Sequence, residues 1–323
     1  MKLVVSSPPH WHVNLTESRI HLDFIIALVP AVIFAVLTYG MHAARVIALA
    51  VSAAVVSEIV IRKLFKKPLT FTDGSAFLIG LLFALLLPPS VPFWLVLVGA
   101  FLCIFIGKEL FGGLGSHPLN PVLVGWAILQ ISWPGYLNIN LAVANYNLGY
   151  DFHYPLAILK KGGIEAISEI NVIDLFLCKQ SGGMGAVAIP LILIGGVYLL
   201  LRKRIPWEIP LSFTAGVVLM ALIFWAGDPT AYTDPLFHLL AGNAMIGIFF
   251  LSTDYSSSPF NRWGMVVFGL GCGFLTVILR VWSISPHAVP FAILIMNLFT
   301  PLLDKIKKKP KPINVSYMEK GLS

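Results

Sequence analysis

Long apolar runs alternate with short polar segments along this chain from about residue 23 to residue 303. Each run approaches the roughly 20 residues that an α-helix needs to cross the hydrocarbon core of a bilayer. The pattern predicts ten membrane-spanning helices, at about 23–40, 43–61, 74–89, 91–107, 120–136, 184–201, 207–227, 235–253, 264–280 and 286–303. The third and fifth runs are short and interrupted by glycine or proline. The expected fold class is an all-α integral membrane protein.

Composition agrees with this class. The 323 residues are 58% hydrophobic and 11% charged, whereas a water-soluble domain has about 25% charged residues. The first apolar run is full length and follows a polar stretch, which argues against a cleavable signal peptide. The three cysteines, Cys103, Cys178 and Cys272, are scattered without metal-ligand spacing, so we expect no metal centre.

Basic residues give the orientation, because cytoplasmic loops of membrane proteins are enriched in Lys and Arg. With a cytoplasmic N-terminus and ten crossings, 17 of the 22 Lys and Arg residues fall on the cytoplasmic side. The outer side receives the remaining five, namely Arg45, Lys160, Lys161, Lys179 and Arg280. Both termini are therefore expected in the cytoplasm. These loops also account for the net charge of +7, so no nucleic-acid partner is needed.

The chain is expected to be a single membrane domain that contains an internal repeat. Gly80-Leu-Leu-Phe and Gly247-Ile-Phe-Phe each open a run followed by an apolar span and a break containing histidine, at 116–121 and 285–290. The two copies fall on the third and eighth predicted spans, which would cross the membrane in opposite directions. The two five-helix halves would therefore be inverted relative to each other, and a site would lie near their interface. Chance similarity between apolar sequences is the alternative. The predicted parts are a first half at about 20–136, an outer loop at about 137–183, a second half at about 184–304 and a basic tail at 305–323.

The stretch from Gly112 to Pro121 is glycine-rich, polar and helix-breaking, and it lies between two apolar runs. Backbone without internal hydrogen bonds is costly at membrane depth unless it lines a buried or watered cavity. Two further polar segments, 70–75 and 252–259, are expected on the same cytoplasmic side. Together they suit a neutral, flat, hydrogen-bonding ligand held between helices. The candidate ligand-binding residues here are Gly113, Gly115, His117 and Asn120.

Other polar residues have simpler interpretations. Helix capping would explain Asp73 and Asp254, although it explains three converging polar segments less well than one. Glu58 lies four residues before Arg62, so a helix-surface ion pair is sufficient there. Glycines 269 and 273 fit close helix packing. His238 and Asn243 remain ambiguous, and the polar outer loop is either a cap over a site or a plain loop.

Four groups of motifs are specific when taken together. They are Thr72-Asp-Gly-Ser-Ala, Gly112-Gly-Leu-Gly with Asn120-Pro121, Ser252-Thr-Asp-Tyr-Ser, and Phe268-Gly-Leu-Gly-Cys-Gly273 with Asn297. This set resembles the D subunit of the Rnf complex, which is homologous to the B subunit of the sodium-pumping NADH:quinone oxidoreductase. The resemblance implies a bacterial or archaeal cytoplasmic-membrane protein that carries electrons through flavins, coupled to Na⁺ or H⁺ movement. It also implies partner subunits of the A, B, C, E and G types.

The sequence departs from this family at the flavin positions. His117 stands where the first Asn of Gly-x-Asn-x-x-Asn-Pro is expected, and Trp126 replaces an Arg. Residues 185–188 differ from the family's Gly-Glu-Thr-Ser. Tyr154 occupies the position of the threonine that anchors FMN through a phosphoester. The expected cofactor is therefore a non-covalent flavin, riboflavin or FMN, with no covalent FMN at the usual position, and with Tyr154 or His153 stacking on its ring.

Three functions remain open at this point. In the first, the chain is a redox-driven pump subunit, and Asp73, Thr253 and Asp254 supply oxygen atoms to the passing cation. In the second, it is a redox-silent transporter or channel on the same fold, since fold alone does not fix function. In the third, it is a scaffold subunit that holds neighbouring redox proteins together.

Overall fold

The computed structural model describes residues 16–68, 73–137, 154–167, 171–178, 180, 182–185, 188–283 and 287–305. In these ranges every element longer than a single residue is a helix. Three of the described helices, Glu17–Leu64, Glu208–Gly227 and Arg262–Trp282, are long and apolar enough to cross a membrane. Four shorter apolar helices accompany them. The predicted all-α class is confirmed, and these helices indicate a membrane protein.

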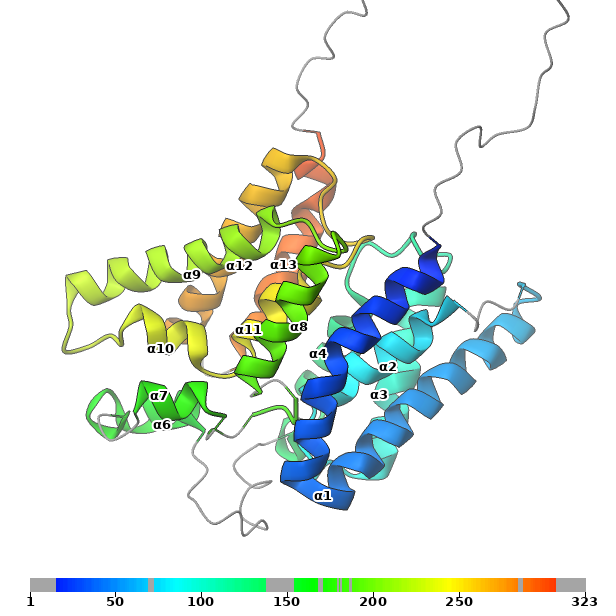
Figure 1. The fold of residues 1–323 in the computed structure, drawn as a ribbon, viewed down its shortest axis with the longest axis horizontal. Coiled ribbons are helices and arrows are strands. Elements are labelled where there is room, and N and C mark those ends of the chain that lie inside the picture. The colour runs from blue at the N-terminus through cyan, green and yellow to red at the C-terminus, as the bar shows by residue number, and fades with distance from the viewer. Residues whose placement is uncertain are drawn as a thin grey trace, which may run out of the picture.

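Helix α1 (Glu17–Leu64) is a hairpin of two helical arms (Figure 1). The arms meet at Gly40, whose φ of 61° and ψ of −141° lie outside the helical region. Glycine adopts such positive φ values without the steric cost that a Cβ atom would impose. The first two predicted spans correspond to these two arms, and the polar-apolar pattern alone had placed their boundary beside this glycine.

The remaining helices of the first half pack around this hairpin. They are α2 (Ser75–Leu86), α3 (Phe93–Ile104), the π-helical turn η2 (Phe105–Glu109), α4 (Pro121–Ser132) and the 3₁₀ turn η3 (Pro134–Leu137). Helices α2 and α3 contact α1, and α4 contacts α3. Between η2 and α4 the chain is irregular, as the composition of residues 112–121 predicted.

The second half begins with α8 (Ile189–Leu201), which contacts α1 and so lies between the two groups of helices (Figure 1). It continues with α9 (Glu208–Gly227), α10 (Pro235–Leu240), α11 (Ala244–Ile246), the π-helical turn η5 (Gly247–Leu251), α12 (Arg262–Trp282) and α13 (Ala288–Leu303). The predicted span at 235–253 is thus two helical pieces, α10 and the continuous α11–η5, rather than one helix. Its break lies at Ala241–Asn243, where Gly242 has a φ of +67°.

Part of the predicted outer loop is folded into short helices. These are α6 (Pro155–Gly162), η4 (Glu165–Ile167) and α7 (Val172–Phe176), and α6 and α7 lie together below α10 in Figure 1. Their apolar side chains form a small core of their own with α10, made of Tyr154, Leu156, Ile167, Leu175, Phe237 and Ala241. His153, one of the predicted site residues, lies outside the described residues.

Glycine allows α9 and α12 to pack backbone to backbone. A Cβ atom added at Gly273 would lie 2.5 Å from the Val217 nitrogen and 2.6 Å from the Phe213 oxygen. We expect Gly273→Ala to lower the stability by about 1–3 kcal/mol, because overpacking forces the helices apart. The thermal midpoint of the purified protein in detergent measures this. Gly227→Ala is the control, because nothing lies within 4 Å of its added Cβ. Equal midpoints for the two variants would contradict the prediction.

Candidate functional site

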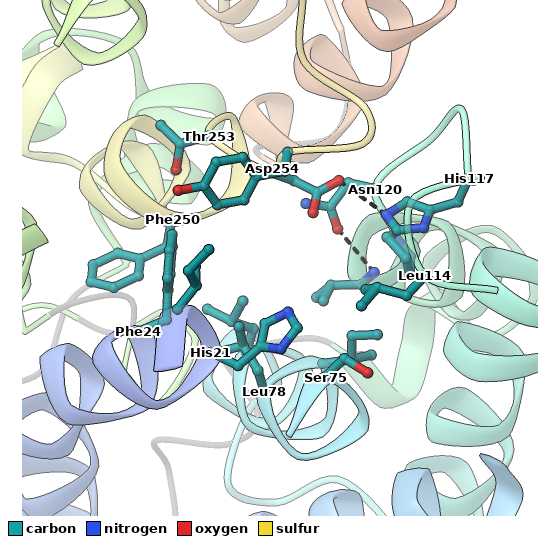
Figure 2. Close-up of a pocket in the computed structure, with 16 residues that line it drawn as sticks. His21, Phe24, Ser75, Leu78, Leu114, His117, Asn120, Phe250, Thr253 and Asp254 are labelled. Carbon is teal, nitrogen blue, oxygen red and sulfur yellow. Dashed lines mark hydrogen bonds and ion pairs between the residues drawn. The ribbon is translucent and has the colours of Figure 1, made fainter. Parts of the chain in front are cut away.

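A partly open cavity lies where the two halves of the chain meet (Figure 2). It contains about 560 Å³ of empty space, a figure that includes the open solvent at its mouth. We call it the inner cavity. Its walls come from α1, α2, the irregular segment before α4, and the residues at the end of η5. The labelled lining residues are His21, Phe24, Ser75, Leu78, Leu114, His117, Asn120, Phe250, Thr253 and Asp254.

The wall formed by α1 and α2 is fixed through Asp73. The Asp73 carboxylate accepts hydrogen bonds from the Ser75 backbone nitrogen at 2.8 Å and from the Ser75 hydroxyl at 2.7 Å. The Asp73 carbonyl oxygen lies 2.7 Å from Nδ1 of His21. Asp73 itself does not line the cavity, whereas Ser75 and His21 do. The structure therefore gives this carboxylate a role in holding the first turn of α2.

Asn120 connects the irregular segment to η5. As the N-cap residue of α4, it accepts from the Val122 nitrogen at 2.9 Å and from the Leu123 nitrogen at 3.4 Å. Its Nδ2 donates to the Leu251 carbonyl oxygen at 2.9 Å. These bonds cap one helix and tie it to a segment more than a hundred residues later in the chain. The Asn120 amide thus shapes the cavity wall, with its polar atoms already engaged by protein groups.

His117 and Asp254 make a second contact between the halves. Nε2 of His117 lies 3.2 Å from Oδ2 of Asp254. The same oxygen accepts from the Ser257 backbone nitrogen at 3.2 Å and the Ser257 hydroxyl at 2.7 Å. Burial alone would raise the pKa of the Asp254 carboxyl, but the bonds from His117 and Ser257 outweigh it and lower that pKa. The carboxylate is therefore ionised at neutral pH.

Nδ1 of His117 is the exception to this pattern of satisfied groups. It is buried and has no hydrogen-bond partner among the described residues. In the tautomer in which Nε2–H donates to Asp254, Nδ1 carries a lone pair that can accept a hydrogen bond. A buried polar atom without a partner is costly. His117 therefore lines the inner cavity and carries one buried polar atom that the described protein groups leave unsatisfied.

The predicted glycines act on the shape of the loop. Gly113 and Gly115 have φ values of +104° and +84°, and neither lines the cavity. Leu114, between them, does line it. Thr253 also lines it, and its hydroxyl donates to the Phe249 carbonyl oxygen at 2.7 Å. The structure thus brings His117, Asn120, Thr253 and Asp254 together around one cavity. The two glycines and Asp73 are not part of its lining.

A buried ionic cluster lies directly behind Ser75. Lys108 Nζ donates to Oε1 of Glu58 at 2.8 Å and to the Ser75 hydroxyl oxygen at 2.6 Å. Arg62 Nε lies 2.9 Å from Oε1 of Glu109 and 3.3 Å from Oε1 of Glu58. The sequence predicted only the pair of Glu58 with Arg62. Lys108 and Glu109 stand side by side at the end of an apolar run, which was the available signal for this larger cluster.

Sequence reasoning missed two kinds of lining residue. His21 and Phe24 belong to α1 and Leu78 to α2, and none of them is part of a local motif. Phe250 lies on the π-helical turn η5, and its ring centroid is 6.2 Å from that of Phe24 in an edge-to-face arrangement.

No group of three His, Cys, Asp or Glu side chains that could hold a metal occurs in the part of the chain that the structure describes.

Comparison with known proteins decides the family. Residues 4–312 match the family described as NQR2, RnfD, RnfE family. The chain belongs to this family. The resemblance inferred from the motifs is thereby confirmed, over nearly the whole chain.

Curated relatives of this family member cover nearly its full length. It is 36% identical over 315 residues to a protein of Clostridium ljungdahlii named as the D subunit of a proton-translocating ferredoxin:NAD(+) oxidoreductase complex, with 95% of each chain aligned. It is 37% identical over 311 residues to a protein of Acetobacterium woodii named as the D subunit of the Na(+)-translocating complex, with 96% of this chain and 95% of the relative aligned. A relative from Methanosarcina acetivorans, named as the D subunit of an ion-translocating oxidoreductase complex, is 34% identical over 310 residues, with 96% of each chain aligned.

Two departures from the expected motifs of the family meet at one residue. The Tyr154 hydroxyl oxygen lies 3.2 Å from Nδ1 of His287, and the two rings stack with centroids 5.8 Å apart. The Trp126 ring approaches the same histidine edge to face at 5.6 Å. Tyr154 is buried and lines a different, smaller cavity of about 180 Å³. One face of its ring is therefore already covered by His287.

Proposed function

We propose that this chain is the D-type membrane subunit of an ion-translocating, Rnf-type electron-transfer complex, which passes electrons between ferredoxin and NAD⁺. In this role it carries electrons through a flavin, and their transfer is coupled to Na⁺ or H⁺ movement. The observation that carries the proposal is the near end-to-end similarity to relatives named as that subunit, one of a proton-translocating and one of a Na⁺-translocating complex. The implied partners are the A, B, C, E and G types of subunit.

The proposed membrane arrangement has ten crossings in two inverted halves. The first half would contribute the two arms of α1, then α2, α3 with η2, and α4. The second would contribute α8, α9, the segment from α10 to η5, α12 and α13. The internal repeat and the excess of Lys and Arg in alternate loops support this arrangement, with both termini in the cytoplasm and the protein in a bacterial or archaeal cytoplasmic membrane.

The inner cavity is the proposed flavin site. Its mostly apolar lining, with a few polar groups, suits a flat ring system. The unpartnered Nδ1 of His117 would accept a hydrogen bond from a ring N–H, and Phe24 and Phe250 would provide aromatic contacts. A bound flavin supplies the redox chemistry, while these residues hold and orient it and limit the access of water. The Asp254 carboxylate and the Thr253 hydroxyl are the proposed oxygen ligands on the cation path, and Asp73, in the wall formed by α1 and α2, is a third candidate.

Electron transfer and ion uptake by the whole complex test the proposal. Inverted membrane vesicles that contain the complex are supplied with reduced ferredoxin and NAD⁺, and NADH formation and Na⁺ or H⁺ uptake are recorded. We expect His117→Ala to reduce both activities at least tenfold and the exposed His42→Ala to leave them unchanged. Full electron transfer in the His117→Ala complex would favour a scaffold. Solute flux through the purified, flavin-free chain in liposomes would favour a transporter. Either result would contradict the proposal.

Tyr154 leads to a separate prediction about cofactor attachment. We expect no covalent FMN on this chain, because a tyrosine stands at the position of the family's threonine anchor and its hydroxyl is buried against His287. Flavin fluorescence of the denatured 35.3 kDa band in a gel measures covalent attachment. The band should be dark, while acid extraction of the native protein should release flavin. A fluorescent band for the wild-type chain that disappears in Tyr154→Phe would contradict this prediction.

A further inference from the structure

His21 presents a hydrogen-bond acceptor to the inner cavity. Its Nδ1 lies 2.7 Å from the Asp73 carbonyl oxygen. A carbonyl oxygen can only accept, so Nδ1 carries the proton of the neutral ring and the lone pair is on Nε2. Nε2 makes no hydrogen bond to a residue that the structure describes. Figure 2 shows the ring projecting into the cavity, so this lone pair is available to a ligand.

Two hydroxyl groups of the lining also have their protons engaged by the protein. The Thr253 hydroxyl donates to the Phe249 carbonyl oxygen at 2.7 Å. The Ser75 hydroxyl donates to Oδ1 of Asp73 at 2.7 Å, and its oxygen accepts from the Lys108 ammonium group at 2.6 Å. Because a hydroxyl has a single proton, Thr253 and Ser75 can offer a ligand only oxygen lone pairs.

The other polar side chains of the lining follow the same pattern. The Tyr255 hydroxyl and Nδ2 of Asn120 each donate to a backbone carbonyl oxygen. The carboxylate of Asp254 has only acceptors, and it takes the Nε2–H of His117, whose Nδ1 then carries a lone pair in the neutral ring. Among these side chains of the described lining, only the second N–H of the Asn120 amide is left as a donor. The side chains around the inner cavity are therefore almost entirely acceptors.

A lining of acceptors favours a ligand that brings donors. Where an acceptor of the ligand meets an acceptor of the protein, both are left without a hydrogen bond, and this is costly in a buried place. No Lys or Arg side chain is part of the described lining that would supply a charged donor. Backbone N–H groups can serve the carbonyl oxygens of a flavin, but its oxidised and reduced forms carry these oxygens alike.

The two redox forms of a flavin differ in the donors that they offer. Reduction of the neutral ring by two electrons takes up two protons, and N1 and N5 change from acceptors into N–H donors. The carbonyl oxygens and N3–H stay the same. The oxidised ring therefore brings two acceptor nitrogens to a lining of acceptors, whereas the reduced ring brings two donors.

We infer that the inner cavity binds the reduced form of a flavin more tightly than the oxidised form, with Nε2 of His21 as a specificity-determining acceptor. The inference rests on the proposed function, because it takes a flavin as the ligand. Tighter binding of the reduced form shifts the equilibrium toward that form. The bound flavin then has a higher reduction potential than the free flavin. A tenfold preference corresponds to about 30 mV for a two-electron couple.

Binding of both redox forms to the same protein tests the inference. The full-length chain, purified in detergent and freed of flavin, is titrated without oxygen with riboflavin and with dithionite-reduced riboflavin, and equilibrium dialysis gives the two dissociation constants. We expect the reduced form to bind at least tenfold more tightly. His21→Phe keeps a flat ring without the acceptor, and Thr253→Val keeps the size of the side chain without the hydroxyl. Each should lower the preference at least threefold, through weaker binding of the reduced form.

His42→Phe is the matched control, because His42 is an exposed histidine of the same helix and does not line the cavity. It should keep the wild-type dissociation constants. Equal affinity for both forms in the wild type, or an undiminished preference in a folded His21→Phe, would overturn the inference and leave the flavin site in place. If His21→Phe does not fold, Thr253→Val decides in the same way. Binding of neither form to the wild type would overturn the proposed flavin site as well.

Discussion

Replacing Lys108 by methionine is expected to lower the free energy of unfolding by about 3 kcal/mol, at the lower end of the roughly 3–5 kcal/mol typical of a broken buried ion pair. The lysine is fully buried, and its ammonium group lies 2.8 Å from the carboxylate of Glu58. Without it, Glu58 stays in the protein interior with a weaker set of partners. Arg62 remains 3.3 Å away, which limits the loss. Unfolding of the detergent-solubilised protein by heat or denaturant measures the change.

Two further variants distinguish the effect of breaking the ion pair on stability from the effect of removing a long side chain. Lys63→Met removes an exposed lysine of α1 and should be nearly neutral. The double variant Glu58→Gln with Lys108→Met should regain most of the lost stability, because no uncompensated carboxylate is then buried at that position. If Lys108→Met proves as stable as Lys63→Met, the account of this cluster is wrong.

Leu114→Trp is expected to reduce the flavin content of the purified protein at least tenfold while the fold remains intact. Leu114 lies on the irregular segment and lines the inner cavity, so an indole there would fill space that the flavin ring needs. Its position on a loop allows the backbone to adjust without disturbing a helix. The flavin released by acid and quantified against protein gives the stoichiometry directly.

The matched control is Leu110→Trp, four residues earlier. Leu110 is 60% exposed and does not line the cavity. Its variant should retain the wild-type flavin content and thermal midpoint. Flavin retained equally by both tryptophan variants would show that the ring lies elsewhere.

Apolar periodicity was sufficient to predict most helices, because each one has to bury or expose a continuous hydrophobic surface. The two arms of α1 and the boundary at Gly40 followed from the pattern. The break within 235–253 did not follow from the pattern. A glycine such as Gly242 within an apolar run occurs both where a helix continues and where it stops. Only the packing of α10 against α7 in the folded protein shows that the helix stops there.

The cavity was only partly predictable for a related reason. Polar residues in helix breaks, such as His117, Asn120 and Asp254, stand out because irregular backbone in an apolar context needs a purpose. The Asp73 carboxylate accepts its hydrogen bond locally, from the Ser75 backbone nitrogen. Residue type alone does not show whether an Asp side chain bonds to nearby backbone or faces a cavity. The contact of Lys108 with Glu58 joins residues 50 positions apart, and no local pattern specifies such a pair.

A density map of the purified native complex tests the central claim most directly. The account predicts flat density for a flavin ring in the inner cavity, within hydrogen-bonding distance of His117 Nδ1 and close to Phe24 and Phe250. Density for a lipid chain in that cavity, with the flavin located elsewhere in the chain or on another subunit, would contradict it.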